Sequence, residues 1–208
     1  NLKQDTTSEL YGAFGYFSEI DLQKEEKGNR YSLKPKFLLR FAPGSMRKQT
    51  SGSRLDPAAA FSMDRLDREN NFETGLSSTL GFDYNVKGGE KELDFSVAQI
   101  LNQKENDKMP SKTSLDEKTS DLVGKSTLKL NDNVSFNYNF SLDENYENFN
   151  YNDLETTIEF NPFKLSFNYL LEDRHIGNQE YFKTSLNYNS KNSSISFETK
   201  RNLIKDSS

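Results

Sequence analysis

Apolar and polar side chains alternate through much of the chain, most regularly between residues 121 and 200. From Val134 to Leu142 every second residue is apolar, and the residues between them are Ser or Asn. The same alternation returns in Leu154–Phe160 and Phe163–Leu171. A period of two predicts a β-strand with one apolar and one polar face. We therefore expect an all-β chain.

Clusters of Gly, Pro, Asn and Asp divide this pattern into about ten strands. The predicted strands are Ser8–Ile20, Arg30–Ala42, Phe72–Val86, Glu92–Asn102, Asp121–Leu130, Val134–Leu142, Tyr151–Phe160, Phe163–Glu172, Glu180–Asn189 and Ser194–Leu203. A charged turn is expected over Asp21–Asn29. The links after odd-numbered strands are short. Those after even-numbered strands are longer, above all the loops from Pro43 to about Asn71 and from Gln103 to Thr119.

The composition limits how such strands can bury their apolar faces. Hydrophobic residues make up 33% of the chain, charged residues 28%, and the net charge is −5, which is polar for an ordinary globular core. The sustained alternation and the 12% of aromatic residues argue against disorder. Two sheets packed face to face, or one closed sheet facing lipid, would each bury the apolar half. No apolar run approaches the roughly 18 residues of a membrane helix, which excludes a helical membrane protein.

Strand length and loop asymmetry favour the closed sheet. The expected strands exceed the usual globular length of about 5–6 residues and suit a tilted membrane crossing. Alternating tight turns and long loops are typical of outer-membrane barrels. We predict an antiparallel up-and-down transmembrane β-barrel segment, about ten strands of a larger barrel. All of residues 1–208 would belong to this one domain.

A barrel assigns each face of a strand to water or to lipid. The residues expected to face a water-filled lumen are Lys34, Lys36, Arg40, Glu73, Asp83, Glu92, Asp94, Glu155 and Glu159. The residues expected to face lipid are Phe136, Tyr138, Phe140, Ile158, Phe160, Leu165, Phe167 and Tyr169. Aromatic girdles are expected at the two rims, from Tyr146, Phe149, Tyr151 and Tyr181 at one and from Phe160 and Phe163 at the other.

Several segments resemble the barrel of the LptD family of lipopolysaccharide (LPS) assembly proteins, also called OstA. The resemblance rests on Leu33–Arg40, Leu55–Pro57, Phe61–Arg65 and Glu73–Tyr84, and further on Ser120–Gly124, Tyr138–Asp143 and His175–Asn178. Two positions depart mildly from the family pattern. Asp64 stands where Asn is more usual, and Thr74 where the pattern often has Gly.

The resemblance implies LPS transport in the Gram-negative outer membrane, without catalysis or a cofactor. In that family the sugar part enters the barrel lumen and the lipid leaves sideways between the first and last strands. It also implies that an N-terminal periplasmic domain and the closing strands of the barrel lie outside residues 1–208. The partners it implies are LPS, an LptE-like lipoprotein that plugs the lumen, and an LptA-like periplasmic bridge reached through that missing N-terminal domain. Outer-membrane lipid would surround the barrel, and no nucleic acid is expected.

Two other classes of protein stay open on the residues alone. A diffusion channel of porin or fatty-acid-transporter type predicts an inward-folded constriction loop and ion conductance without a plug. A soluble sandwich or adhesin-like domain predicts a chain that folds without detergent.

The residues that carry catalysis or bind metals are sparse. The chain has no Cys and one histidine, His175, in a predicted loop, so no metal site is expected. The mixed-charge segment Asp64, Arg65, Asp67, Arg68 and Glu69 is interpreted as a solvated loop, with a cation-bridged contact to LPS phosphates as the alternative. No Ser, His and Asp arrangement predicts an enzyme.

Overall fold

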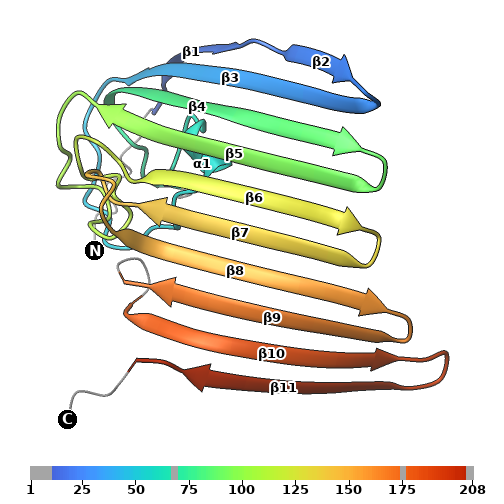
Figure 1. Ribbon diagram of the computed structural model, residues 1–208. Helices are drawn as coiled ribbons and strands as arrows, with labels where there is room; N and C mark the ends of the chain where they lie inside the picture. The colour runs from blue at the N-terminus through green and yellow to red at the C-terminus, as the bar shows by residue number, and fades with distance from the viewer. Residues whose placement is uncertain (1–10, 67–69, 174–176, 205–208) are drawn as a thin grey trace.

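Eleven strands and one four-residue helix make up the regular structure of residues 11–66, 70–173 and 177–204, which the computed structural model describes (Figure 1). The strands are β1 (Phe14–Glu19), β2 (Leu22–Glu26), β3 (Asn29–Ala42), β4 (Gly75–Gly88), β5 (Lys91–Asn102), β6 (Leu122–Asn131), β7 (Val134–Leu142), β8 (Phe149–Phe160), β9 (Phe163–Glu172), β10 (Gln179–Asn189) and β11 (Ser194–Asn202), and the helix is α1 (Pro57–Ala60). The all-β prediction is confirmed, and the ten predicted strands are present with shifted ends. The first predicted strand, Ser8–Ile20, is β1 from Phe14 to Glu19, and its residues Ser8–Leu10 lie outside the described residues.

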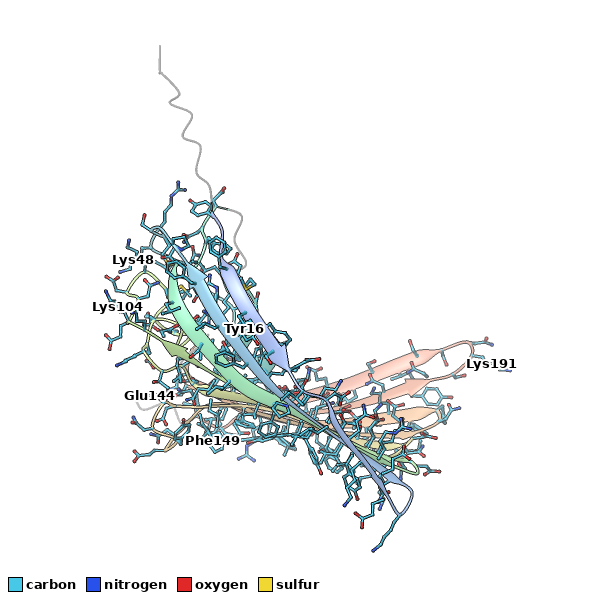
Figure 2. The ribbon with its side chains drawn as sticks, turned by 90° about the horizontal axis from the view of Figure 1, so that it is seen from above. Tyr16, Lys48, Lys104, Glu144, Phe149 and Lys191 are labelled. Carbon is cyan, nitrogen blue, oxygen red and sulfur yellow. The ribbon has the colours of Figure 1, made fainter. Side chains whose placement is uncertain are left out.

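All the strands belong to one antiparallel sheet, and from β2 to β11 each strand pairs with the next one in the sequence. The order runs from β1 through β3 to β11, and β2 also pairs with β3. The sheet does not close on itself: β1 and β2 form one edge and β11 the other (Figure 1). The strand direction rotates steadily between these edges in the view from above (Figure 2), as the right-handed twist of strands requires.

The charged turn predicted over Asp21–Asn29 is wrong. Leu22–Glu26 is a strand that pairs with the first residues of β3. The turn is reduced to Lys27 and Gly28, which both have positive φ, 51° and 80°, as a two-residue hairpin of type I′ requires. The charged side chains of β2 are exposed, and the backbone hydrogen bonds of an edge strand do not depend on them.

The short and long links lie at opposite ends of the sheet, as predicted. Tight turns join β2 to β3, β4 to β5, β6 to β7, β8 to β9 and β10 to β11 at the right in Figure 1. The long loops after β3 and β5 and the shorter ones after β7 and β9 lie at the left. Lys48, Lys104 and Glu144 mark the long-loop end in Figure 2, and Lys191 marks the short-turn end.

The strand register divides the side chains between two faces, because directly opposed residues of an antiparallel ladder point the same way. One row across the sheet reads Asp94, Thr127, Asn137, Glu155, Asn168, Lys183 and Lys200. We name this side the polar face. It carries Lys34, Lys36, Arg40, Asp83, Glu92, Asp94, Glu155 and Glu159, the expected lumen-facing residues that lie in strands.

The other side, which we name the apolar face, carries every residue expected to face lipid: Phe136, Tyr138, Phe140, Ile158, Phe160, Leu165, Phe167 and Tyr169. None of them is buried in a protein interior. Phe160, for example, is 51% exposed. The structure thus separates the two sets, and that lipid covers the apolar face stays a prediction.

At the long-loop end the polar face is covered and buried from solvent. The described parts of the two longest loops, residues 43–66, 70–74 and 103–121, fold over it, and we name them the loop cap. An apolar core joins the cap to β5 and β6 through Met46, Leu55, Ala60, Leu66, Met109 and Leu115 of the cap and Ala98, Ile100 and Val123 of the sheet. This core was not predicted from the sequence, because its sheet residues Ala98, Ile100 and Val123 lie on the face that carries polar side chains elsewhere in the sheet.

Helix α1 anchors the middle of the cap and was also not predicted. The Asp56 carboxylate caps it by accepting a hydrogen bond of 2.7 Å from the Ala59 amide, and Pro57 occupies its first turn. An N-cap Asp, a Pro and three alanines form a helix-start signal that was present in the sequence. Within the described residues, no helix is long and apolar enough to cross a membrane.

Candidate functional site

The base of the loop cap is fixed to the sheet by a buried charge cluster. The Arg65 guanidinium binds the Glu73 carboxylate through two hydrogen bonds, one of 2.6 Å from Nε to Oε2, and donates a third of 2.9 Å to the Ser77 hydroxyl. Arg40, on β3, donates to the Met63 carbonyl at 2.7 Å and to the Glu73 carbonyl, and its Nη1 lies 3.7 Å from the Glu73 carboxylate. Two cations therefore share one carboxylate.

This cluster corrects two expectations. Glu73 precedes β4 and is 4% exposed, and Arg40 is 1% exposed, so the cap keeps both away from water. Arg65 is buried as well, which makes the solvated-loop interpretation wrong at that residue. Asp67, Arg68, Glu69 and His175 lie outside the described residues. The clue in the sequence was an Arg in the loop followed eight positions later by a Glu at the start of a strand.

On the far side of the cap, the loop after β3 reaches β8 and β9 through Arg54. The Arg54 guanidinium hydrogen-bonds the Glu172 carboxylate and lies 3.6 Å from the centre of the Tyr151 ring. Glu172 and Tyr151 are directly opposed on the polar face. Arg54 thus links the loop after β3 to strands more than ninety positions further along the chain. Nothing in the sequence pattern pointed to this contact.

Away from the cap, the polar face carries cationic, anionic and neutral hydrogen-bonding groups. Salt bridges join Lys36 to Asp83, Lys164 to Glu159 at 2.8 Å, and Lys183 to Glu198 at 2.8 Å. Amides and hydroxyls fill the space between them: Asn85 donates to Asp94 at 2.7 Å, Thr127 to Asn137 at 3.0 Å and Asn168 to Asp153 at 2.6 Å. Such a surface can exchange its partners with water, sugar hydroxyls and phosphates.

The aromatic girdles are only partly as expected. At the short-turn end the rings of Phe160, Phe163 and Tyr188 pack on the apolar face, with centroids 5.5 and 5.2 Å apart. At the other end Phe149 contacts Phe140 at 6.4 Å. Tyr151 and Tyr181 instead lie on the polar face, since their register partners Ser141 and Leu170 do. A position near a strand end does not decide the face.

One group of carboxylates among the described residues brings three oxygens within 4.8 Å of one another: Glu117, Asp121 and Glu144. Oxygens are the ligands that hard cations prefer. The Asp121 Oδ2 already accepts hydrogen bonds from Ser141 at 2.6 Å and Asn150 at 2.9 Å. Through these bonds Asp121 joins the end of the loop after β5 to β7 and to the start of β8.

The loop after β7 has a carboxylate that holds it in shape. Asp143 accepts a hydrogen bond of 3.0 Å from the Asn148 side chain and one of 2.8 Å from the Glu147 amide. These bonds, the Asn148 bond foremost, lower the pKa of the Asp143 carboxyl below its ordinary value of 3.8. The charged form therefore stabilises the loop above pH 3.8, and this stabilisation is lost as the pH falls through the lower pKa of the folded state.

We expect pepsin to cut the loop over residues 143–148 of the intact protein faster as the pH falls below the ordinary carboxyl pKa of 3.8 and through the lower pKa of Asp143 in the folded state. In Asp143→Asn the carboxyl that titrates is gone, so cleavage at this loop, measured relative to another pepsin site in the same sample, should not vary with pH. An equal pH dependence in the two proteins would show that Asp143 does not hold the loop.

Comparison with known families identifies the chain. Residues 60–203 match the model of LptD, described as LPS transport system D. The chain belongs to the LptD family. The resemblance inferred from the sequence is thereby confirmed. No curated protein matches the chain.

The match covers Ala60 at the end of α1, Arg65, Glu73 and all strands from β4 to β11. The segment Leu33–Arg40 and Arg54, which contacts Glu172, precede the matched residues. LptD is a family of LPS transport and assembly proteins of the outer membrane, so the chain is placed among proteins that handle LPS. The family is one of transport and assembly proteins and is not known as enzymatic.

Proposed function

We propose that this chain is a section of an outer-membrane barrel that delivers LPS to the outer leaflet. The observation that carries the proposal is the division of one continuous sheet into two faces of opposite chemistry. Large apolar side chains stay exposed along the apolar face, at strands from β3 to β11. A surface of this extent is costly in water, and acyl chains would cover it.

The polar face would then line the path of the sugar. It has salt bridges that a phosphate can enter and amides that can bind hydroxyls, and no titratable nucleophile is needed for such transport. The two free edges of the sheet would pair with further strands, because an uncovered edge exposes unpaired backbone groups. An LptE-like plug inside the barrel and an LptA-like bridge on the periplasmic side complete the proposed assembly.

Photo-crosslinking from two adjacent residues of β7 tests the proposal in the complete protein in cells. A photoreactive residue at Asn137 would lie on the polar face, and one at Tyr138 on the apolar face. We expect Asn137 to capture LPS only while new LPS is supplied from inside the cell. Tyr138 should capture lipid whether or not the supply continues. Capture at Asn137 that never depends on the supply would contradict transport along the polar face.

A diffusion channel is the second candidate, because the loop cap folds over the polar face as a constriction loop would. It predicts ion conductance by the purified protein in a planar bilayer without any plug. Conductance with no supply-dependent LPS capture at Asn137 would favour this candidate.

A further inference from the structure

The loop after β3, the longer part of the cap, is attached to the sheet at two places of different character. At its base Arg40, Arg65, Glu73 and Ser77 form a buried network, and the apolar core fixes α1 to β5 and β6. Toward β8 and β9 this loop contacts Glu172 and Tyr151 through Arg54, while the loop after β5 is bonded to β8 separately, through Asp121 and Asn150 at 2.9 Å. The loop after β3 therefore has a buried base, and a partly exposed side chain, Arg54, connects it to β8 and β9.

Arg54 extends the cap across the polar face to β8 and β9. The cap starts at β3 and β4, lies on β5 and β6, and Arg54 then bridges to β8 and β9, so the cap stands across the polar face at the long-loop end. In Figure 1 the loops of the cap lie at that end of the sheet, beside β3 to β8. Anything that moves along the polar face toward this rim meets the cap.

The exposure of the two partners also differs. The Arg54 side chain is 26% exposed and can be approached from solvent, whereas that of Glu172 is 2% exposed. A guanidinium binds phosphate in the same two-pronged manner as it binds a carboxylate. A phosphorylated sugar on the polar face would therefore compete with Glu172 for Arg54.

We propose that Arg54 is a latch that holds the loop after β3 closed over the polar face, and that a phosphate group arriving on this face releases this part of the cap by taking the place of Glu172. The proposal rests on the proposed function for the source of the phosphate. The closing role of the latch depends only on the contacts of Arg54.

Conductance of the complete protein in planar bilayers tests the closing role. Arg54→Gln removes the charge that pairs with Glu172, and Lys48→Gln is the matched control, since Lys48 is an exposed cation of the same loop (Figure 2). We expect a severalfold higher open probability for Arg54→Gln and no change for Lys48→Gln. Equal open probabilities for Arg54→Gln and the unaltered protein would overturn the latch.

A crosslink tests the same point by joining the two positions covalently. The chain has no cysteine, so Arg54→Cys with Glu172→Cys gives one thiol pair in this section, which a short cleavable crosslinker can join. The joined protein should stop delivering LPS and recover when the linker is cut. Undiminished delivery by the joined protein would overturn the latch even if Arg54→Gln failed to assemble.

Inorganic phosphate and glucose 6-phosphate, added to the unaltered protein in the bilayer, test release. Both should raise its open probability, and neither should affect Arg54→Gln. Failure of both to act would refute release by phosphate. A response to the sugar phosphate alone would show that the sugar contributes to recognition. Supply-independent capture at Asn137 combined with a working latch would refute LPS transport and leave the latch as the gate of a diffusion channel.

Discussion

Replacing Glu73 by alanine is expected to lower the free energy of unfolding by about 3–5 kcal/mol, the usual cost of removing one partner of a buried ion pair. The change leaves the guanidinium groups of Arg40 and Arg65 buried side by side with no carboxylate between them. The measurement is urea unfolding of the complete protein in lipid vesicles, monitored by circular dichroism, which does not depend on tryptophan fluorescence.

Glu159→Ala is the matched control for this loss of a carboxylate. Glu159 pairs with Lys164 at 2.8 Å on the same face, but both side chains are about half exposed. An exposed pair contributes about 0–1 kcal/mol, so this variant should unfold almost like the unaltered protein. Equal destabilisation by the two substitutions would show that the charge cluster at the cap base has no special role.

Replacing Phe167 by arginine is expected to cost about 2–4 kcal/mol of folding free energy in a bilayer, the cost of a cation near the middle of the lipid face of a barrel. Phe167 lies centrally in β9 on the apolar face and stacks on Phe182 at 6.2 Å. The substitution also removes this ring contact, so Phe167→Leu is needed to separate the loss of the ring from the gain of the charge.

Asn168→Arg gives the matched comparison, since the next residue along β9 points to the polar face, where Asn168 bonds to Asp153. An arginine there lies between Glu155 of β8 and Lys183 of β10 and faces water, so attraction and repulsion offset each other and its effect should stay within about 0.5 kcal/mol. Folding yield into vesicles over a urea series measures both variants. Equal tolerance of arginine at 167 and 168 would contradict a lipid-covered apolar face.

The strands and their two faces were readable in the sequence because each depends on local order. Alternation such as Val134 to Leu142 fixes which residues share a face, and Asn, Gly and Pro clusters mark the turns. The prediction failed at Leu22–Glu26, where charge suggested a turn. A strand at the edge of a sheet needs only backbone partners, which the charge of its side chains does not reveal.

The candidate site was only partly predictable for a related reason. The polar residues of the strands were identified, but Arg40 and Glu73 were expected in water and are buried under the loop cap. Burial depends on what lies over a residue, and the covering loop comes from another part of the chain. The pairing of Arg65 with Glu73 and the reach of Arg54 to Glu172 likewise follow from the path of a loop, which no period in the sequence encodes.

The sequence by itself determined an antiparallel sheet with ten strand positions, short turns at one end, long loops at the other, and one apolar and one polar face. Local periodicity and turn chemistry are sufficient for this, because each strand presents its own side chains alternately. The tertiary structure alone decided that the longest loops fold back over the polar face, that an apolar core and a buried ion cluster hold them there, and that Arg54 spans to β8 and β9. These contacts join residues distant in sequence, and only the folded path of the chain brings them together.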